Sequence, residues 1–255
     1  MLVRLGQEGL AAASLMNRAV ALARLGGFKA ALAAYGEAQA VFDAAGCEAD
    51  GARCRANRAN LLACLGRTKE ALACYEQAQD VLAHSGDQRE LACCIANRAV
   101  ALGRQGRFQE ALAAIGEARS MFVHLGDVCE EARCLAGRAE IFVGLGRAQE
   151  ALDCYGEAQA IYARLERKLD VARCILGRAG VLRGQRRLRE ALVAYDEAHA
   201  LYADAGQRIE AARCTMQRAS VLVARGRAAE ASVGLEEARV VLARAAQDRR
   251  GQQTA

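Results

Sequence analysis

Apolar residues recur at intervals of three and four positions along the whole chain, which is the spacing of an amphipathic helix and not of a strand. In residues 88–124, one apolar stripe precedes Gly106 and a second stripe follows it. The two stripes are Leu91, Cys94, Ile95, Ala99 and Leu102, and then Ala111, Leu112, Ile115, Ala118 and Phe122. The pattern predicts two helices joined by a glycine turn, because glycine readily adopts the left-handed conformation that ends a helix.

This helix pair returns every forty residues. A position followed by Arg-Ala recurs at Asn17, Asn57, Asn97, Gly137, Gly177 and Gln217. A constant period of this size is typical of a solenoid, in which each helix pair buries its apolar face against its neighbours in the chain. We therefore expect one all-α solenoid over residues 1–246, followed by a polar tail at 247–255. The expected repeats lie near 8–46, 48–86, 88–126, 128–166, 168–206 and 208–246.

The glycines set the expected helix boundaries within each repeat. First helices are expected near 8–25, 48–65, 88–105, 128–145, 168–185 and 208–225. Second helices are expected near 28–44, 68–84, 108–124, 148–164, 188–204 and 228–245. Turn glycines stand at Gly6, Gly26, Gly46, Gly66, Gly86, Gly106, Gly126, Gly146, Gly206 and Gly226.

Three places depart from this regular pattern. Residues 1–6 align with 41–46, so the chain is expected to open on the last turn of a second helix that ends at Gly6. Glu166 and Arg186 stand where the other repeats have glycine, and a left-handed conformation there costs on the order of 1 kcal/mol. Those two turns are expected either to be looser or to let the helices run on.

Composition adds the chemistry of the interior. Hydrophobic residues make up 53% of the chain and aromatic residues only 4%, so small side chains let the helices pack closely. Of the eleven cysteines, five recur at one repeat position. Because packed helices are already ~8–10 Å apart, this ladder cannot cross-link itself, and we expect reduced, buried packing residues in a cytoplasmic protein. The ladder consists of Cys54, Cys94, Cys134, Cys174 and Cys214.

The repeat resembles the tetratricopeptide (TPR) pattern of small and large residues. The residues that carry the resemblance are Asn17-Arg18-Ala19, Leu22, Gly26, Phe28, Ala31-Leu32, Tyr35 and Glu37-Ala38, and the same set starting at Asn97-Arg98-Ala99. The period of forty exceeds the usual period of about 34, and proline is absent. The resemblance implies a right-handed α-solenoid of about six TPR-like helix-turn-helix repeats that acts as a protein-interaction scaffold.

In TPR arrays the first helices line a concave groove, and the resemblance maps that lining onto four rows of this chain. The groove is thus expected to carry arginines and amides, with few large apolar pockets. The residues expected to bind a peptide are Asn17, Arg24, Arg53, Asn57, Asn60, Asn97, Arg104, Arg133, Arg173 and Arg213.

Arginines dominate one of these rows, and they allow two interpretations. A planar guanidinium suits the bidentate capture of carboxylates, so the groove is predicted to bind an acidic, extended peptide. An acidic residue also stands three positions before each of these arginines, and such pairs stabilise an exposed helix by roughly 0.2–0.5 kcal/mol without any partner. The pairs are Asp50 with Arg53, Glu130 with Arg133, Asp170 with Arg173, and Glu210 with Arg213.

A second series of arginines occupies a repeat position where the TPR family usually has leucine. We expect mainly a packing role, with a long stem between helices and the charged head on a polar residue of the same repeat. The series is Arg18, Arg58, Arg98, Arg138, Arg178 and Arg218, with expected partners Glu37, Gln77, Glu117, Glu157, Glu197 and Glu237.

Catalytic and nucleic-acid functions are disfavoured. The chain has three histidines and no metal-ligand spacing of the CxxC or HxxxH type, so we expect no enzyme activity, metal or cofactor. The net charge of +5 is mild, and the aromatic residues fall at core positions of second helices, which disfavours RNA binding. The sequence has no long apolar run, so we expect no membrane partner. Two alternatives to a scaffold stay open: a peptide-sensing regulatory array of a larger signalling protein, and end-to-end self-association.

Overall fold

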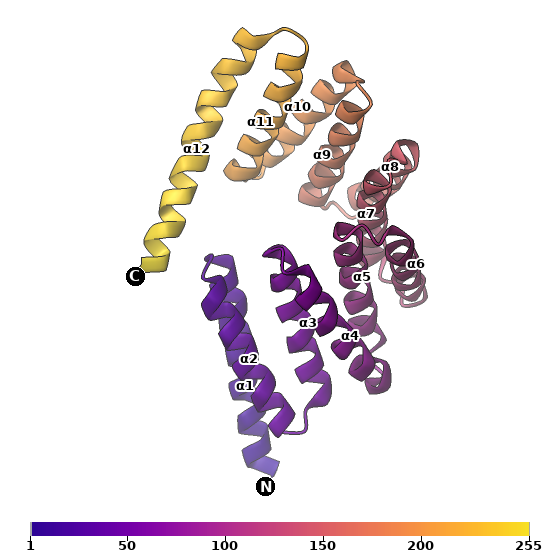
Figure 1. Cartoon of the computed structure of the whole chain (residues 1–255), viewed down its shortest axis with the longest axis vertical. Helices are drawn as coiled ribbons and strands as arrows, with labels where there is room; N and C mark the ends of the chain where they lie inside the picture. The colour runs from indigo at the N-terminus through magenta and orange to yellow at the C-terminus, as the bar shows by residue number, and fades with distance from the viewer. Residues whose placement is uncertain (1, 255) are drawn as a thin grey trace. The chain divides into compact units, whose positions relative to one another are not determined.

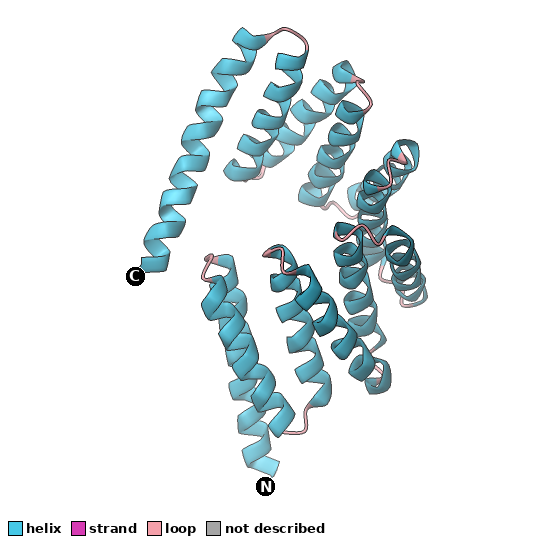
Figure 2. Cartoon of the chain, in the orientation of Figure 1, coloured by secondary structure: helices cyan, strands magenta, loops and turns pink. Residues whose placement is uncertain are grey.

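The computed structural model describes the backbone of residues 2–254 and the side chains of residues 9–245 and 247. Twelve α-helices and no strands occupy this part of the chain, in consecutive antiparallel pairs (Figures 1 and 2). The helices are α1 (Leu2–Arg24), α2 (Phe28–Ala44), α3 (Glu48–Cys64), α4 (Thr68–Ser85), α5 (Gln88–Arg104), α6 (Phe108–His124), α7 (Val128–Gly144), α8 (Ala148–Arg164), α9 (Lys168–Gly184), α10 (Leu188–Asp204), α11 (Arg208–Ala224) and α12 (Ala228–Thr254).

Ten of the twelve helices begin and end within one residue of the expected positions, and the two others differ at one end. The expected break at Gly6 is wrong, because α1 begins at Leu2 and passes through that glycine. A glycine inside a helix costs only about 1 kcal/mol, so a favourable helical context on both sides overrides it. At the other end α12 continues to Thr254, through residues expected to form a polar tail.

The turns between helices share one backbone conformation. Nine glycines have a positive φ, and so do Glu166 at 55° and Arg186 at 61°. At both positions the helices stop as they do in the other repeats, so the expectation of looser turns or longer helices is wrong. The backbone amides of Arg167 and Arg187 bond to the carbonyl oxygens of Tyr162 and Leu182, as in the glycine turns, so these hydrogen bonds hold the left-handed residue in place.

The chain divides into two compact units, one extending to Gly126 and the other comprising Asp127–Gly251. In the first unit α2 packs on α1 and α3, and α4 packs on α3 and α5. In the second unit α8 packs on α7 and α9, and α10 packs on α9 and α11. The first helices of neighbouring repeats also touch, α3 with α5 and α7 with α9. The helix pairs named here are near neighbours along the chain, as in a repeat array.

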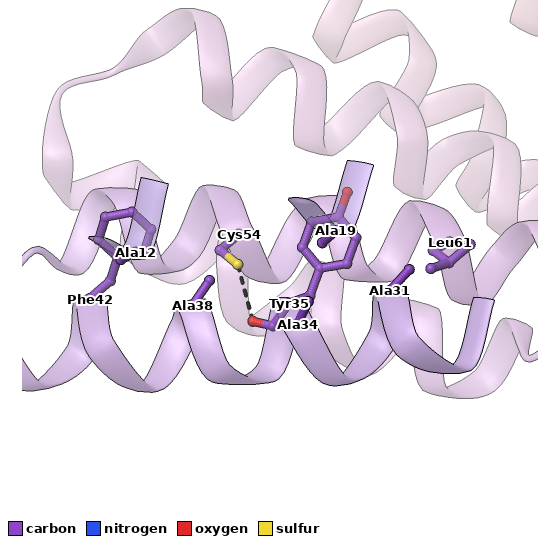
Figure 3. Packing of buried hydrophobic residues seen from close by; sticks show 9 residues of the cluster. All are labelled: Ala12, Ala19, Ala31, Ala34, Tyr35, Ala38, Phe42, Cys54 and Leu61. Atoms are coloured by element: carbon purple, nitrogen blue, oxygen red, sulfur yellow. Dashed lines mark hydrogen bonds between the residues drawn. The ribbon is translucent and has the colours of Figure 1, made fainter. Parts of the chain in front are cut away.

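The core consists of alanines at the helix crossings with larger side chains between them. Figure 3 shows one such cluster, in which Tyr35 and Phe42 of α2 pack among alanines of α1 and α2 and against Cys54 and Leu61 of α3. Alanine lets two helix backbones approach, and the aromatic rings fill the space beside the crossing. The alanine that follows each arginine of the second series is completely or almost completely buried in all six repeats, at Ala19, Ala59, Ala99, Ala139, Ala179 and Ala219.

Candidate functional site

The residues predicted to line a groove lie on the face of the first helices that the core leaves uncovered, which we call the open face. In α3, Arg53, Asn57 and Asn60 are half-buried, whereas Ala52 and Ala59 are fully buried. Asn97 of α5 and Arg133 of α7 are half-buried in the same way. The remaining predicted residues are exposed, and they are Asn17, Arg24, Arg104, Arg173 and Arg213.

The arginine row of the open face is paired along its own helices. The guanidinium of Arg53 donates to Asp50 over 2.7 Å, and that of Arg133 donates to Glu130 over 2.5 Å. The guanidinium of Arg213 lies 3.2 Å from the carboxylate of Glu210. The helix-supporting pairs therefore exist in this structure, and each arginine uses only part of its five N–H donors in them.

Asp170 is the one buried charged residue among those whose side chains are described, with 6% of the residue's surface exposed. Its carboxylate accepts hydrogen bonds from Arg167 over 2.8 Å and forms an ion pair with Arg173 over 3.2 Å. Two cations thus hold one carboxylate at the start of α9. The acidic position repeats in the sequence, but its burial in this repeat alone left no sequence signal.

Tyrosines of two second helices donate hydrogen bonds to amide side chains on the open face. The hydroxyl of Tyr75, which is 1% exposed, donates to Oδ1 of Asn60 over 2.5 Å, and that of Tyr195 donates to Oε1 of Gln217 over 3.2 Å. Burial raises the pKa of Tyr195, so its hydroxyl stays protonated and can donate. In each amide the oxygen accepts the tyrosine hydrogen bond, so the N–H₂ group of Asn60 and of Gln217 is not engaged by the tyrosine. Sequence reasoning placed these tyrosines in the core and missed their second role.

The ring of Tyr155 explains one of the glycines on the open face. A Cβ atom at Gly177 would lie 2.5 Å from Cζ of Tyr155, so no larger residue fits there without movement. Burial, with a smaller contribution from Glu140, raises the pKa of Tyr155. In contrast, a Cβ at Gly180 or Gly184 would meet nothing within 4 Å, so these two glycines leave open helix backbone on the same face.

Five arginines of the second series are half-buried, in line with the expected packing role, whereas Arg18 is exposed. The heads of Arg178 and Arg218 do not reach the expected partners. Arg178 donates to Gln159 over 2.7 Å instead of pairing with Glu197, and Nε of Arg218 lies 2.6 Å from Oδ1 of Asp196 and not from Glu237. In both cases the partner belongs to the second helix of the preceding repeat. These arginines therefore link neighbouring repeats, and their role in packing between helices is what the sequence indicated.

Three other members of the series, Arg58, Arg98 and Arg138, are half-buried without an ion pair in the described part of the chain. The guanidinium carbon of Arg138 lies 5.1 Å from the ring centre of Phe142, at cation–π distance. The Nε atoms of Arg58 and Arg98 are buried without a hydrogen-bond partner among the described residues. A long arginine stem can fill apolar space beside its charged head, which is how a position that usually holds leucine can accept arginine.

The cysteine ladder is buried, which confirms the expected packing role. All eleven cysteines are free thiols, and the five ladder members are each at most 2% exposed. Burial raises the pKa of the thiols of Cys54, Cys174 and Cys214 to about 11 and that of Cys94 to about 12. Within the described part of the chain, no three histidine, cysteine, aspartate or glutamate side chains gather in a way that would hold a metal ion.

Comparisons with known proteins agree with this architecture. Residues 90–164 match the family model described as tetratricopeptide repeat. A Rap protein complexed with Competence and Sporulation Factor shares 15% identity over 94% of this chain and 70% of its own, with a TM-score of 0.73. The Rap conjugation gene regulator of plasmid pLS20, in complex with the Phr* peptide, shares 15% identity over 94% and 74%, with a TM-score of 0.68.

A third solved structure is similar over most of its own length. A putative kinesin light chain from Podospora anserina with nearly identical TPR-like repeats shares 18% identity over 76% of this chain and 96% of its own, with a TM-score of 0.61. No curated protein sequence matches the chain. The likenesses confirm the predicted fold class, an all-α solenoid of TPR-like helix-turn-helix repeats. Among the described residues, no helix is both long and apolar enough to span a membrane.

Proposed function

Because the chain is a tetratricopeptide-like helical-repeat protein, we propose that it binds a peptide or protein segment on the open face of its first helices, without catalysing a reaction. TPR-like repeats are protein-interaction modules, and this general role is the starting point. The specific ligand proposed is an acidic segment in extended conformation. The binding residues are those predicted from the sequence, together with Gln217.

The observation that carries the proposal is the pair of tyrosine–amide hydrogen bonds. Tyr75 and Tyr195 hold the oxygens of Asn60 and Gln217, so each amide presents two N–H donors in a fixed orientation. An extended peptide offers unpaired backbone carbonyl oxygens, and these accept hydrogen bonds from such donors. Donors fixed in advance also lose little conformational entropy on binding, which favours affinity.

The acidic character of the ligand is supported by the arginines of the open face. Arg173 and Arg213 are 66% and 55% exposed, and their ion pairs with Asp170 and Glu210 are the longer ones of the row, at 3.2 Å. A guanidinium has five N–H donors, so it can hold a ligand carboxylate while keeping its own helix partner. A ligand of this kind would meet these arginines beside open backbone at Gly180.

A charge-reversal experiment tests the proposal. A fluorescein-labelled peptide of alternating Glu and Ala is titrated against the wild type and against the double variant Arg173→Glu, Arg213→Glu, and a loss of affinity of at least tenfold is expected. The matched control is Arg164→Glu, Arg189→Glu, which changes the net charge equally on exposed second-helix positions. The proposal fails if the first variant binds as tightly as the wild type, or if both variants lose affinity equally.

A peptide-sensing regulatory array is the second candidate. It is supported by the likeness to two Rap proteins, one complexed with Competence and Sporulation Factor and the other with the Phr* peptide. A sensor changes its conformation on binding, whereas a scaffold presents a preformed surface. Hydrogen exchange with and without the peptide separates the two: protection confined to the contacted helices indicates a scaffold, and changes in distant helices indicate a sensor.

End-to-end self-association and a cytoplasmic location stay proposals. The last helix exposes Val233 and Val240, which are 68% and 44% accessible, as residues of a docking helix would be. Sedimentation velocity at several concentrations tests the association, and a single monomer species at the highest concentration excludes it. The buried, reduced cysteine ladder is what supports a reducing compartment.

A further inference from the structure

A cavity of about 560 Å³ lies in the second compact unit, between α8, α9 and the start of α10. Leu152, Gly156 and Gln159 of α8 line it, with Arg178 and Leu182 of α9 and the first turn of α10. Its volume falls within the range of roughly 300–1,000 Å³ that is usual for small-molecule sites. None of the predicted peptide-binding residues lines this cavity.

The next repeat shows which side chain can occupy the position of Gly156. Asp196 stands forty residues after Gly156, and Arg218 stands forty residues after Arg178. In that repeat the carboxylate of Asp196 lies 2.6 Å from Nε of Arg218. The protein therefore contains its own example of a carboxylate in an ion pair with the arginine of this repeat position.

At the cavity, the position equivalent to Asp196 is Gly156, which carries no carboxylate. A Cβ atom at Gly156 would meet no atom within 4 Å, so the space that an aspartate side chain would fill is open. The hydrogen bond of Arg178 in this structure goes to the neutral amide of Gln159, over 2.7 Å. Glycine is an unfavourable residue inside a helix, and no packing contact accounts for it here.

The other charged groups around the cavity are already paired. The guanidinium of Arg187 donates two hydrogen bonds to Glu190, over 2.8 Å and 2.7 Å. The carboxylate of Asp153 accepts from Gln149 over 2.8 Å. Arg178 is thus the cation of the cavity without an acidic partner, and the two neighbouring carboxylates disfavour a ligand of higher negative charge such as phosphate.

We propose that this cavity binds a small monocarboxylate, whose carboxylate takes the place on Arg178 that Asp196 takes on Arg218. The short aliphatic part of the ligand packs on Leu152 and Leu182. The site is separate from the peptide-binding face, and it depends on a different set of side chains. An experiment that disproves carboxylate binding here therefore does not disprove peptide binding on the open face, and the reverse also holds.

Butyrate and butyramide are the probes, because they share an aliphatic chain and differ in the charge of the head group. The Nε–H resonance of Arg178 is followed by NMR while each is titrated into the wild-type chain. We expect a saturable shift with butyrate and at least tenfold weaker binding of butyramide. Equal binding of the two probes, or no saturable shift with butyrate, overturns the proposal without any variant.

The variant Gly156→Asp supplies the missing carboxylate from the chain itself. It is expected to abolish the response to butyrate, because the new side chain occupies the site as Asp196 does one repeat later. The matched control is Gly180→Asp, which adds the same side chain to open space on α9, away from the residues lining the cavity. Undiminished butyrate binding by folded Gly156→Asp contradicts the assignment, and so does an equal loss in the control.

Discussion

The thiol of Cys54 donates a hydrogen bond to the backbone carbonyl oxygen of Tyr35, over 3.2 Å (Figure 3). Cys94 bonds to the carbonyl oxygen of Tyr75 over 3.5 Å. In both cases a first helix bonds to the second helix of the preceding repeat. A cysteine suits this position because it is small enough for the close helix crossing and still carries a weak donor.

The buried thiols predict a loss of stability at high pH. Burial raises the pKa of Cys54 to about 11 and that of Cys94 to about 12, above the ordinary value of 9.0. Their contribution is complete below pH 9 and is lost as the pH rises through 11 to 12, because the unfolded chain ionises first. We expect the free energy of unfolding to fall by on the order of 1 kcal/mol per thiol between pH 8 and pH 10.5.

The variant Cys54→Ser, Cys94→Ser separates this effect from the titration of the buried tyrosines. Serine keeps a donor and does not ionise in this range, so the variant loses less stability over the same pH interval. Urea denaturation at the two pH values measures the difference. Identical pH dependence in the wild type and the variant would show that these thiols do not carry the effect.

Local features of the sequence determined the helix boundaries. Each turn needs one residue with positive φ, and a glycine occupies that position in most repeats. The regular spacing of these glycines was therefore enough to predict where the helices end. At Gly6 the same residue type does not end a helix, because a glycine permits a turn without enforcing one. Whether a glycine ends a helix depends on its tertiary context, and the sequence of a single turn does not contain that information.

The partners of buried polar groups depend on packing between repeats, and sequence reasoning did not determine them. Arg178 was expected on a residue of its own repeat and instead bonds to Gln159 of the preceding one. Gln159 and the expected partner Glu197 are equally far from Arg178 along the chain, so spacing could not distinguish them. The hydrogen bond from Tyr75 to Asn60 was missed for a related reason, since it depends on how deeply the ring inserts between two helices.

The two left-handed turn residues other than glycine predict stabilising substitutions. Glu166 and Arg186 have φ values of 55° and 61°, where a side chain costs about 1–2 kcal/mol. Glycine removes this strain and adds some unfolded-state entropy, so Arg186→Gly is expected to stabilise the chain by up to about 1 kcal/mol. The midpoint of urea denaturation measures the gain.

The opposite substitution provides the control for these turns. Gly206 has a φ of 70° in an equivalent turn, so Gly206→Ala is expected to destabilise by about 1 kcal/mol. If Arg186→Gly lowers the denaturation midpoint while Gly206→Ala leaves it unchanged, strain at these residues is not what limits stability.

Two glycines of α9 predict opposite effects of the same mutation. Gly177→Ala places a Cβ atom 2.5 Å from the ring of Tyr155 and is expected to destabilise by about 1–3 kcal/mol. Gly180→Ala meets open space and is expected to stabilise by about 0.5–1 kcal/mol, the helix propensity difference. Chemical denaturation of the two variants checks the signs, and equal effects would mean that the ring moves aside at no cost.

The burial of Asp170 predicts that this carboxylate contributes more to stability than Asp50, its counterpart three repeats earlier. Its side chain is 9% exposed and holds two arginines, whereas that of Asp50 is 43% exposed and holds Arg53 alone. Hydrogen bonds between charged groups in partly buried sites contribute about 1.5–3 kcal/mol, and exposed pairs on one helix contribute about 0.2–0.5 kcal/mol.

Asp170→Ala should therefore lower the free energy of unfolding several times more than Asp50→Ala. Salt provides an independent check, because at 1 M the Debye length is about 3 Å and exposed pairs are screened far more than buried ones. Denaturation in 1 M sodium chloride should remove the effect of Asp50→Ala and retain most of that of Asp170→Ala. Equal losses for the two variants, or equal screening, would place the carboxylate of Asp170 in solvent and remove its role in joining Arg167 and Arg173 at the start of α9.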